Sequence, residues 1–260
     1  MKQSFAPVIT NTQVMPGVYL IWLESPQIAS EAKPGQFIML HCGDETLLRR
    51  PLSIHQWGNA SGKARLAFLF TVVGKGTHWL SQCQAGDTID LLGPLGNGYS
   101  IRPASHNLLL VAGGIGVAPL CFLAQQALNQ GYSVRLLLGT STASQLYPEH
   151  LLPADAELII ATEDGTAGKK GMITDLLPDH VSWADQIFAC GPTSMYRAMA
   201  AQPLLKAKPA QVSLEVRMGC GLGVCYGCTV KTKSGLRQLC KDGPVFDLGD
   251  ILWDELAFEL

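Results

Sequence analysis

The sequence has little charge, and the two signs nearly balance. Only 15% of its 260 residues are charged, and 19 Lys and Arg against 21 Asp and Glu leave a net charge of −2. It lacks the long basic runs, and the alternation of basic and aromatic residues, that mark nucleic-acid binding. We therefore expect no nucleic acid among its partners.

The sequence also lacks a clear membrane anchor or secretion signal. Residues 1–5 do not begin an apolar core of the kind a signal peptide has. Residues 105–134 contain no Asp, Glu, Lys or Arg, but Gly113, Gly114, Gly116 and Pro119 interrupt this run. It is predicted as buried strand, turn and helix rather than as a membrane span, so no membrane partner is expected.

Two or three folding units are expected, because 260 residues exceed the usual size of one domain and 47% of them are hydrophobic. Residues 1–102 hold short strand-like runs separated by turn residues, a pattern typical of a small antiparallel β-barrel. Strands are expected near residues 18–23, 36–41, 66–72 and 88–92, with one helix near 77–83.

From residue 107 the pattern changes to apolar strands that alternate with helices. Strands are expected at residues 108–112, 133–138, 158–162 and 186–190, with a helix over 117–130. This alternation is typical of a doubly wound parallel sheet. The predicted fold class is therefore multi-domain β and α/β: a barrel over residues 1–102, an α/β domain over 103–210 and a small domain over 211–260.

Four of the eight cysteines lie within 21 residues: Cys220, Cys225, Cys228 and Cys240. The C-x4-C-x2-C spacing of the first three opens plant-type [2Fe–2S] ligation. Glycines between the cysteines let the backbone curl with its amides toward thiolate and sulfide charge. Eleven residues separate Cys228 from Cys240, fewer than in free plant ferredoxins, so we expect the cluster in a reduced, appended domain.

Two other interpretations of these cysteines stay open. A zinc site usually has two separated C-x2-C pairs or a Cys2His2 pattern, whereas here a C-x4-C step precedes a single C-x2-C. The four thiols could also be unliganded. The remaining cysteines are scattered, and Cys42, Cys83 and Cys121 are expected to be small buried hydrophobic residues.

Two elements of the predicted barrel are suited to phosphate. Arg50, fixed by Pro51, offers a guanidinium fork to a phosphate or pyrophosphate, and the Ser53 hydroxyl could hydrogen-bond the edge of a flavin ring. A surface arginine pair beside an ordinary strand is the alternative. Residues 74–77, Gly-Lys-Gly-Thr, precede the predicted helix, whose N-terminal amides can bind an anion. Together the two elements favour a flavin dinucleotide.

Two glycine-containing turns follow strands of the predicted α/β domain. Residues 113–116, Gly-Gly-Ile-Gly, depart from the G-x-G-x-x-G fingerprint because Pro119 stands where the third glycine would be. Residues 190–192, Cys-Gly-Pro, follow the last predicted strand at the carboxyl edge of the sheet. A small buried residue before a tight turn is the alternative for Cys190.

The barrel motifs resemble the flavin domain of the ferredoxin–NADP reductase superfamily. In that family the R-x-x-S motif holds the flavin phosphate and isoalloxazine, and a glycine-rich loop holds the pyrophosphate. Residues 93–98, Gly-Pro-Leu-Gly-Asn-Gly, add to the match, whereas residues 69–71 lack the arginine of a Tyr-Arg pair often found there. The resemblance implies FAD contacts from these residues: Arg50, Pro51, Leu52, Ser53, Leu69, Phe70, Thr71, Gly74, Lys75, Gly76 and Thr77.

The two turns of the α/β domain are similar to the pyridine-nucleotide loops of the same superfamily. There, the cysteine of Cys-Gly-Pro lies near the nicotinamide. The resemblance implies that the following residues bind NAD: Gly113, Gly114, Gly116, Cys190, Gly191 and Pro192. Ser53 and Cys190 are the residues assigned to the reaction, and they would act by orienting flavin and nicotinamide rather than as an acid or a base.

Over nearly the whole chain, the order of units resembles the electron-transfer subunits of class B, NAD-dependent dihydroorotate dehydrogenases, most specifically in residues 213–228. The resemblance implies electron transfer between NAD and an FMN-containing catalytic subunit that oxidises dihydroorotate in pyrimidine biosynthesis, through FAD and [2Fe–2S], within a heterotetramer. Related subunits serve hydrogenases and NADH-dependent ferredoxin:NADP oxidoreductases, and a non-redox zinc-bearing module is the remaining alternative. Because oxidising compartments endanger such clusters, a cytosolic location is expected.

Two further expectations concern coenzyme choice and the protein surface. Residues 139–144 contain no Arg or Lys for a 2′-phosphate and no acid for a ribose diol, and from this absence we expect NADH to be preferred over NADPH. Leu222, Val224 and Tyr226 alternate with the ligand cysteines. They either form an apolar surface for the partner or fold inward to shield the cluster from water.

Overall fold

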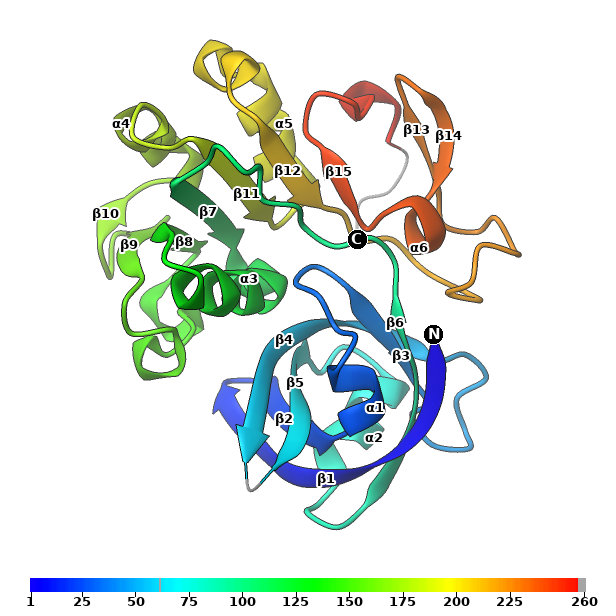
Figure 1. Ribbon diagram of the computed structural model, residues 1–260. Coiled ribbons are helices and arrows are strands. Elements are labelled where there is room, and N and C mark those ends of the chain that lie inside the picture. The colour runs from blue at the N-terminus through cyan, green and yellow to red at the C-terminus, as the bar shows by residue number, and fades with distance from the viewer. Residues whose placement is uncertain (61, 257–260) are drawn as a thin grey trace.

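The computed structural model describes residues 1–60 and 62–256, in which a closed barrel is followed by a seven-stranded sheet (Figure 1). The barrel has the strand order β1-β2-β5-β4-β3-β6, and all its neighbouring strands are antiparallel. Two short helices, α1 (Pro26–Ala29) and α2 (Lys75–Gln82), lie in its connections. The barrel strands are β1 (Lys2–Met15), β2 (Val18–Glu24), β3 (Phe37–Leu40), β4 (Arg50–Ala60), β5 (Lys63–Thr71) and β6 (Thr88–Leu95).

The predicted barrel is confirmed, but two of its strands, β1 and β4, were not among the expected strand runs. The expected runs correspond to β2, β3, β5 and β6, and the expected helix begins earlier, at Lys75. Strand β1 was missed because it has two partners: its first half pairs with β6 and its second half with β2. A register shift between Val8 and Thr10 interrupts the alternation by which a strand is recognised.

The predicted doubly wound sheet is also confirmed, with the strand order β10-β9-β8-β7-β11-β12-β15. All neighbouring strands are parallel except β12 and β15. Its strands are β7 (Asn107–Gly113), β8 (Ser133–Thr140), β9 (Glu157–Thr162), β10 (Lys169–Lys170), β11 (Gln186–Cys190), β12 (Ala210–Ser213) and β15 (Val245–Asp247). The sequence had predicted β7, β8, β9 and β11.

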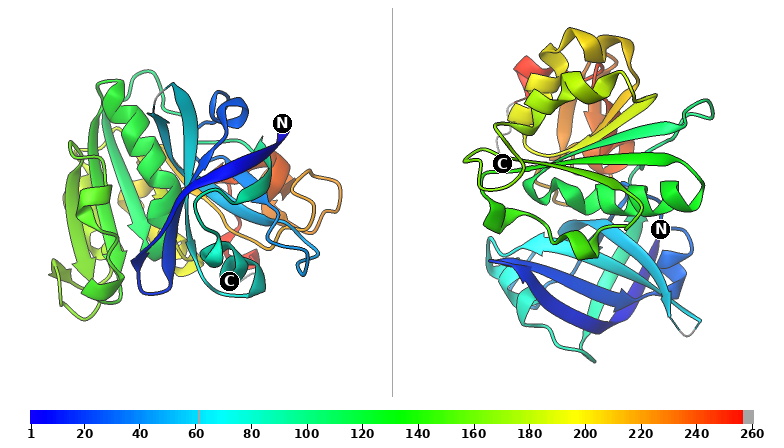
Figure 2. Two further views of the ribbon diagram at one scale, coloured as in Figure 1. Left: turned by 90° about the horizontal axis from the view of Figure 1, so that it is seen from below. Right: turned by 90° about the vertical axis from the view of Figure 1, so that its left-hand side faces the viewer.

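Alternate residues of the sheet fill two different cores. Leu108, Leu110 and Ala112 of β7 pack with α3 (Val117–Asn129), whereas Leu109 and Val111 pack with α4 (Leu177–Val181) and α5 (Thr193–Ala201). Helix α3 lies between the sheet and the barrel, as the right-hand view of Figure 2 shows. Both faces of the parallel sheet are therefore covered, which explains its nearly continuous apolar strands.

The C-terminal segment leaves the sheet after β12 and returns to it. It contains the hairpin β13 (Thr229–Thr232) and β14 (Gly235–Gln238), then α6 (Leu239–Asp242), before β15 pairs with β12. The sheet thus extends across residue 210, where we had predicted a boundary, and the division into three domains stays a prediction. None of the helices in the described part of the chain has the length and apolarity to span a membrane.

Candidate functional site

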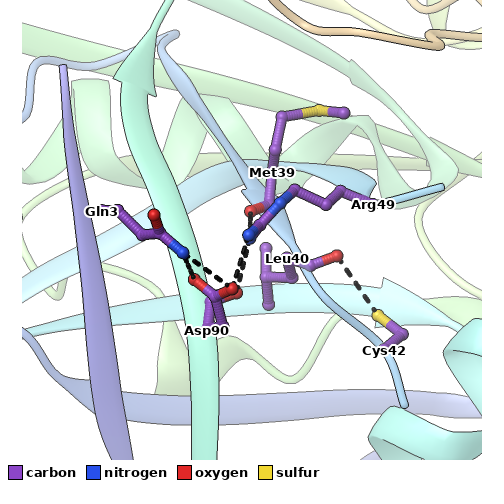
Figure 3. Close-up of polar contacts among 6 residues, drawn as sticks. All are labelled: Gln3, Met39, Leu40, Cys42, Arg49 and Asp90. Carbon is purple, nitrogen blue, oxygen red and sulfur yellow. Dashed lines mark hydrogen bonds and ion pairs between the residues drawn. The ribbon is translucent and has the colours of Figure 1, made fainter. Parts of the chain in front are cut away.

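The two adjacent arginines at the start of β4 have different surroundings. Arg49 donates to the Asp90 carboxylate at 2.5 Å and to the Asp90 carbonyl at 3.1 Å, while Gln3 donates to the same carboxylate at 3.0 Å (Figure 3). Arg49 therefore joins the loop before β4 to strand β6. Among residues 1–60 and 62–256 no carboxylate pairs with Arg50, so its guanidinium charge is available to a ligand.

Arg50 lies against the N-terminus of α2. A Cβ atom placed on Gly76 would be 2.8 Å from Arg50 Nε, so only glycine lets the guanidinium approach the first turn this closely. A helix N-terminus carries unpaired amides and a partial positive charge. Arg50, Gly74, Lys75 and Gly76 thus come together in an arrangement that fits a phosphate or pyrophosphate of FAD.

Other predicted flavin residues have more ordinary surroundings. The Thr77 hydroxyl caps its own helix, accepting from the Val73 and Gly74 amides at 2.9 and 3.1 Å. Phe70 packs in the barrel core, Leu69 packs between barrel and sheet, and Thr71 lines a cavity. Pro51, Leu52 and Ser53 lie on β4, opposite β3. The FAD contacts of all these residues stay predictions.

The predicted nucleotide turns meet at the carboxyl edge of the sheet. A Cβ on Gly116 would lie 2.0 Å from the Cys190 carbonyl oxygen, and one on Gly113 would lie 2.7 Å from Pro192 Cδ. Gly191 is held by its amide, which donates to the Tyr196 hydroxyl at 2.8 Å. Only residues without a side chain allow these two turns to pack so closely.

Two cavities open beside these turns. One, of about 500 Å³, is lined by Gly113, Gly116, residues 190–194, residues 196–197 and residues 214–216. The other, of about 580 Å³, lies between barrel and sheet and is lined by Thr71, residues 113–115 and residues 139–141, among others. The arrangement fits an extended dinucleotide that crosses the carboxyl edge of the sheet, which is where such folds bind ligands.

The first cavity brings Cys190 close to a carboxylate to which sequence analysis gave no role. Cys190 is buried, and burial together with the nearby Glu215 charge raises its pKa well above the usual range, so its thiol is neutral. Glu215 lines the cavity and is exposed there. The sequence offered one signal for Glu215, which is its place within residues 213–218, shortly before Cys220.

The second cavity contains an acid that sequence analysis overlooked. Glu163 follows β9, and its carboxylate accepts a hydrogen bond from the Ser141 hydroxyl, which follows β8, at 2.8 Å. Both residues line the cavity. The expectation of no acid near residues 139–144 was therefore too narrow, because an adjacent strand of the parallel sheet supplies one.

Two of the four cysteines of the C-terminal segment form a close pair. Cys228 and Cys240 Sγ atoms are 3.3 Å apart, and the Cys240 amide donates to Cys228 Sγ at 3.5 Å. In the described part of the chain, no three or more His, Cys, Asp or Glu side chains form one metal-binding group. The closely placed Cys228 and Cys240 thiols are compatible with a [2Fe–2S] cluster, which four cysteine thiolates bind.

Backbone amides point at these sulfurs. The Gly223 amide donates to Cys240 Sγ at 3.1 Å and the Leu222 amide to Cys220 Sγ at 3.3 Å. Burial opposes ionisation of Cys220, but the amides of Leu222, Cys225 and Val224 outweigh it and lower its pKa to about 6. This curled loop matches the predicted ligand environment, and the ligand roles of the four cysteines stay predictions.

The cysteine loop lies directly against the barrel. Gly221 has φ +71°, and a Cβ atom placed on it would lie 2.8 Å from Met39 Cγ. The missing side chain therefore lets Met39 pack against this loop. Met39 lies on β3, opposite Pro51 of the predicted flavin motif. Asn97 adds a second contact, since its side chain donates to the carbonyls of Lys241 and Asp242 beside Cys240.

Two family models match parts of this chain. Residues 6–99 match an oxidoreductase FAD-binding domain, and residues 215–252 match the iron-sulfur cluster binding domain of dihydroorotate dehydrogenase B. The first match includes Arg50 and the N-terminus of α2, and the second includes all four cysteines of the C-terminal segment. The matches thus cover the two groups of residues that the geometry singles out.

Curated relatives match the chain over nearly its full length. A Desulforamulus reducens protein named "Dihydroorotate dehydrogenase B (NAD(+)), electron transfer subunit" is 38% identical over 258 residues, which are 96% of this chain and 98% of that protein. A protein of the same name from Clostridium acetobutylicum is 38% identical over 247 residues, with 94% and 95% covered.

Solved structures share the fold. A structure of the NADH-dependent reduced ferredoxin-NADP oxidoreductase, described in connection with flavin-based electron bifurcation, superposes with a TM-score of 0.87 at 31% identity and covers 97% of this chain and 91% of its own. The ferredoxin reductase of carbazole 1,9a-dioxygenase gives a TM-score of 0.68 at 20% identity, over 80% of this chain and 67% of its own. The second likeness concerns the fold alone.

Proposed function

The chain belongs to the family of electron transfer subunits of NAD(+)-dependent dihydroorotate dehydrogenase B, and from this we infer which of its residues serve each cofactor. It is an oxidoreductase subunit that binds FAD and a [2Fe–2S] cluster and passes electrons between NAD and a catalytic FMN subunit, which converts dihydroorotate to orotate in pyrimidine biosynthesis. When bound, the flavin exchanges electrons in pairs with nicotinamide and singly with the cluster.

The observation that carries this conclusion is the contact between Met39 and Gly221. The Met39 backbone is opposite Pro51, in the motif assigned to FAD, and its side chain packs on the loop assigned to the cluster. One residue thus lies between the two redox sites. A structural zinc module would have no need for this contact, and the match of residues 215–252 to an iron-sulfur cluster binding domain also disfavours zinc.

The chain's own residues bind and orient the redox groups. Arg50 and the amides of Lys75 and Gly76 are assigned to the FAD phosphates, and Ser53 is assigned to the flavin edge. Cys190, as a neutral thiol, and the turn of residues 113–116 are assigned to the nicotinamide half of NAD. Cys220, Cys225, Cys228 and Cys240 are assigned to the cluster, in a loop whose amides stabilise sulfur charge.

Reconstitution with the catalytic subunit tests this function. The isolated chain, with FAD and cluster intact by absorbance, is mixed with an FMN-containing dihydroorotate dehydrogenase subunit, and NADH formation from NAD and dihydroorotate is followed. We expect turnover from the mixture and none from either protein alone. Absence of both binding and turnover, with intact cofactors, would exclude this partner. By family analogy we expect a heterotetramer, located in the cytosol.

A second partner class is favoured by one observation. The NADH-dependent reduced ferredoxin-NADP oxidoreductase covers 97% of this chain at 31% identity, so the same architecture serves another complex. Transfer of electrons from NADH to a ferredoxin-linked subunit, measured in the same assay without dihydroorotate, would favour this alternative.

A further inference from the structure

His55 is completely buried where the barrel meets the sheet. Its exposed fraction is 0%, although it lies on β4 among residues that are partly open to solvent. The register of β4 against β5 shifts between Ile54 and Gln56, so His55 occupies a β-bulge, which redirects a side chain out of the regular alternation. The bulge turns the imidazole toward the α/β domain.

Both ring nitrogens of His55 bond to that domain. Nδ1 is 2.9 Å from the Ala118 carbonyl oxygen, and Nε2 is 2.8 Å from the Tyr147 hydroxyl. A carbonyl can only accept, so Nδ1 carries the proton and Nε2 accepts from the tyrosine. Burial lowers the pKa of His55 to about 4, which keeps this neutral form at physiological pH. The ring also meets Tyr147 edge to face at 5.3 Å.

Each group in this contact is two residues from a residue of the candidate site. On β4, His55 lies two residues after Ser53. At the start of α3, Ala118 lies two residues after Gly116. Tyr147 lies two residues after Gln145, which lines the second cavity. One imidazole therefore connects the flavin strand with two separate walls of the nucleotide site. Ala118 belongs to the connection between β7 and β8, and Tyr147 belongs to the connection between β8 and β9.

The contact between β4 and the α/β domain, called the seam below, continues along β4 beyond His55. Gln56 donates to the Leu151 carbonyl at 2.9 Å and to Cys121 Sγ of α3 at 3.2 Å. Farther along, Gln125 of α3 exchanges two hydrogen bonds with the Trp57 backbone, at 3.2 and 2.9 Å. Gln125 and Trp57 lie at the solvent-exposed end, so they offer a comparison within the same seam.

We propose that His55 is a positioning residue, which fixes the flavin-binding strand relative to both nucleotide-binding walls and so sets the approach of nicotinamide to flavin. This inference rests on the proposed assignment of FAD and NAD to the two sides of the seam. Each ligand is bound mainly by its own side, so loss of the link changes their relative position more than the binding of either one. A misplacement of about 1 Å can slow a transfer step about 100-fold.

The test replaces His55 with phenylalanine, which keeps an aromatic ring of similar size and removes both hydrogen bonds. For the His55→Phe holoprotein we expect FAD content and the dissociation constant of ADP-ribose to stay within about twofold of the native values. We expect the rate of flavin reduction by NADH in stopped flow to fall at least about tenfold, and the long-wavelength charge-transfer absorbance of the flavin–nicotinamide pair to weaken.

Two further variants keep the test decisive. Tyr147→Phe removes one hydroxyl and leaves the Ala118 bond, so it should show a smaller loss of both signals, and it carries the test if His55→Phe does not fold. Gln125→Ala, at the exposed end of the seam, should behave as the native protein. Native rate and charge-transfer absorbance in His55→Phe, or an equal loss in Gln125→Ala, would overturn the proposal. A native chain whose flavin is not reduced by NADH would instead refute the proposed function.

Discussion

Arg49 and Arg50 are adjacent in the sequence, yet we expect them to have different functions. Because no carboxylate of residues 1–60 and 62–256 pairs with Arg50, which lies at the N-terminus of α2, Arg50→Gln should lower FAD affinity at least about tenfold with little loss of stability. Arg49 is partly buried and bound to Asp90. Arg49→Gln should instead lower the free energy of unfolding by about 1–3 kcal/mol and spare FAD binding. FAD titration and urea unfolding of both variants separate the two roles; reversed effects would contradict the assignment.

We expect coenzyme choice to depend on Glu163. Its carboxylate accepts from the Ser141 hydroxyl and lines the second cavity, where we expect it to accept from the 2′-hydroxyl of NADH and to repel the 2′-phosphate of NADPH. We expect Glu163→Gln to reduce the NADH over NADPH ratio of kcat/KM by about 10- to 100-fold. Binding of 2′,5′-ADP, which carries the same phosphate, should strengthen in parallel.

The adjacent Asp164 is a matched control for this prediction. Its carboxylate accepts from the Thr166 amide and hydroxyl and is absent from the lining of the cavity. Asp164→Asn should therefore leave the coenzyme ratio within about twofold of native. If this variant shifts the ratio as much as Glu163→Gln does, general surface charge rather than a ribose contact determines the preference.

At the scale of elements, regular local patterns could be predicted from the sequence and contacts between distant segments could not. The apolar runs of β7, β8, β9 and β11 are long enough to identify by themselves. Strands β12 and β15 have four and three residues, and β15 is a strand because it pairs with β12. The same limit applies to the site: Glu163 meets Ser141 only because parallel strands end at one edge of the sheet.

The cysteine loop is the element whose structure depends most on its ligand. Cys225 is exposed, so we expect the proposed cluster to be its main anchor. Cys225→Ser should lose the iron and sulfide, loosen the C-terminal segment toward limited proteolysis and keep FAD bound, because ligation and local folding are coupled. Iron and sulfide analysis gives the direct result, and two irons per chain in the variant would contradict the ligand assignment. Cys83→Ser, a buried barrel cysteine, should keep the cluster.

Across the whole molecule, the candidate nucleotide, flavin and cluster sites lie one after another, and the last of them is at the surface. The nucleotide cavities adjoin the barrel, Met39 joins the flavin motif to the cysteine loop, and the loop is at the exterior. The question left open by the sequence, whether the apolar residues between the cysteines fold inward, is answered by exposure: Leu222 is 42% exposed, and Val224 and Tyr226 are each 70% exposed. Tyr226 holds this position at φ +59°, which is unusual for a bulky residue.

The exposed apolar residues of the cysteine loop predict how the complex forms. A partner that receives single electrons must approach the cluster closely, and burial of Leu222, Val224 and Tyr226 would favour association there. We expect Val224→Asp to weaken binding of the catalytic subunit at least about tenfold, since a charge would be desolvated in the interface. Its FAD content, iron content and direct reduction by NADH should stay native, so the defect would appear only when electrons must cross between subunits.

Leu236 provides the control, because it is 68% exposed on β14 of the same C-terminal segment but lies outside the cysteine loop. Leu236→Asp introduces the same charge on a similarly exposed apolar residue and should leave the complex intact. Sedimentation velocity of each variant with the catalytic subunit measures association, and dihydroorotate-dependent NADH formation measures the coupled flow. Val224→Asp that associates like the native chain, or Leu236→Asp that fails equally, would place the docking surface elsewhere than over the cluster.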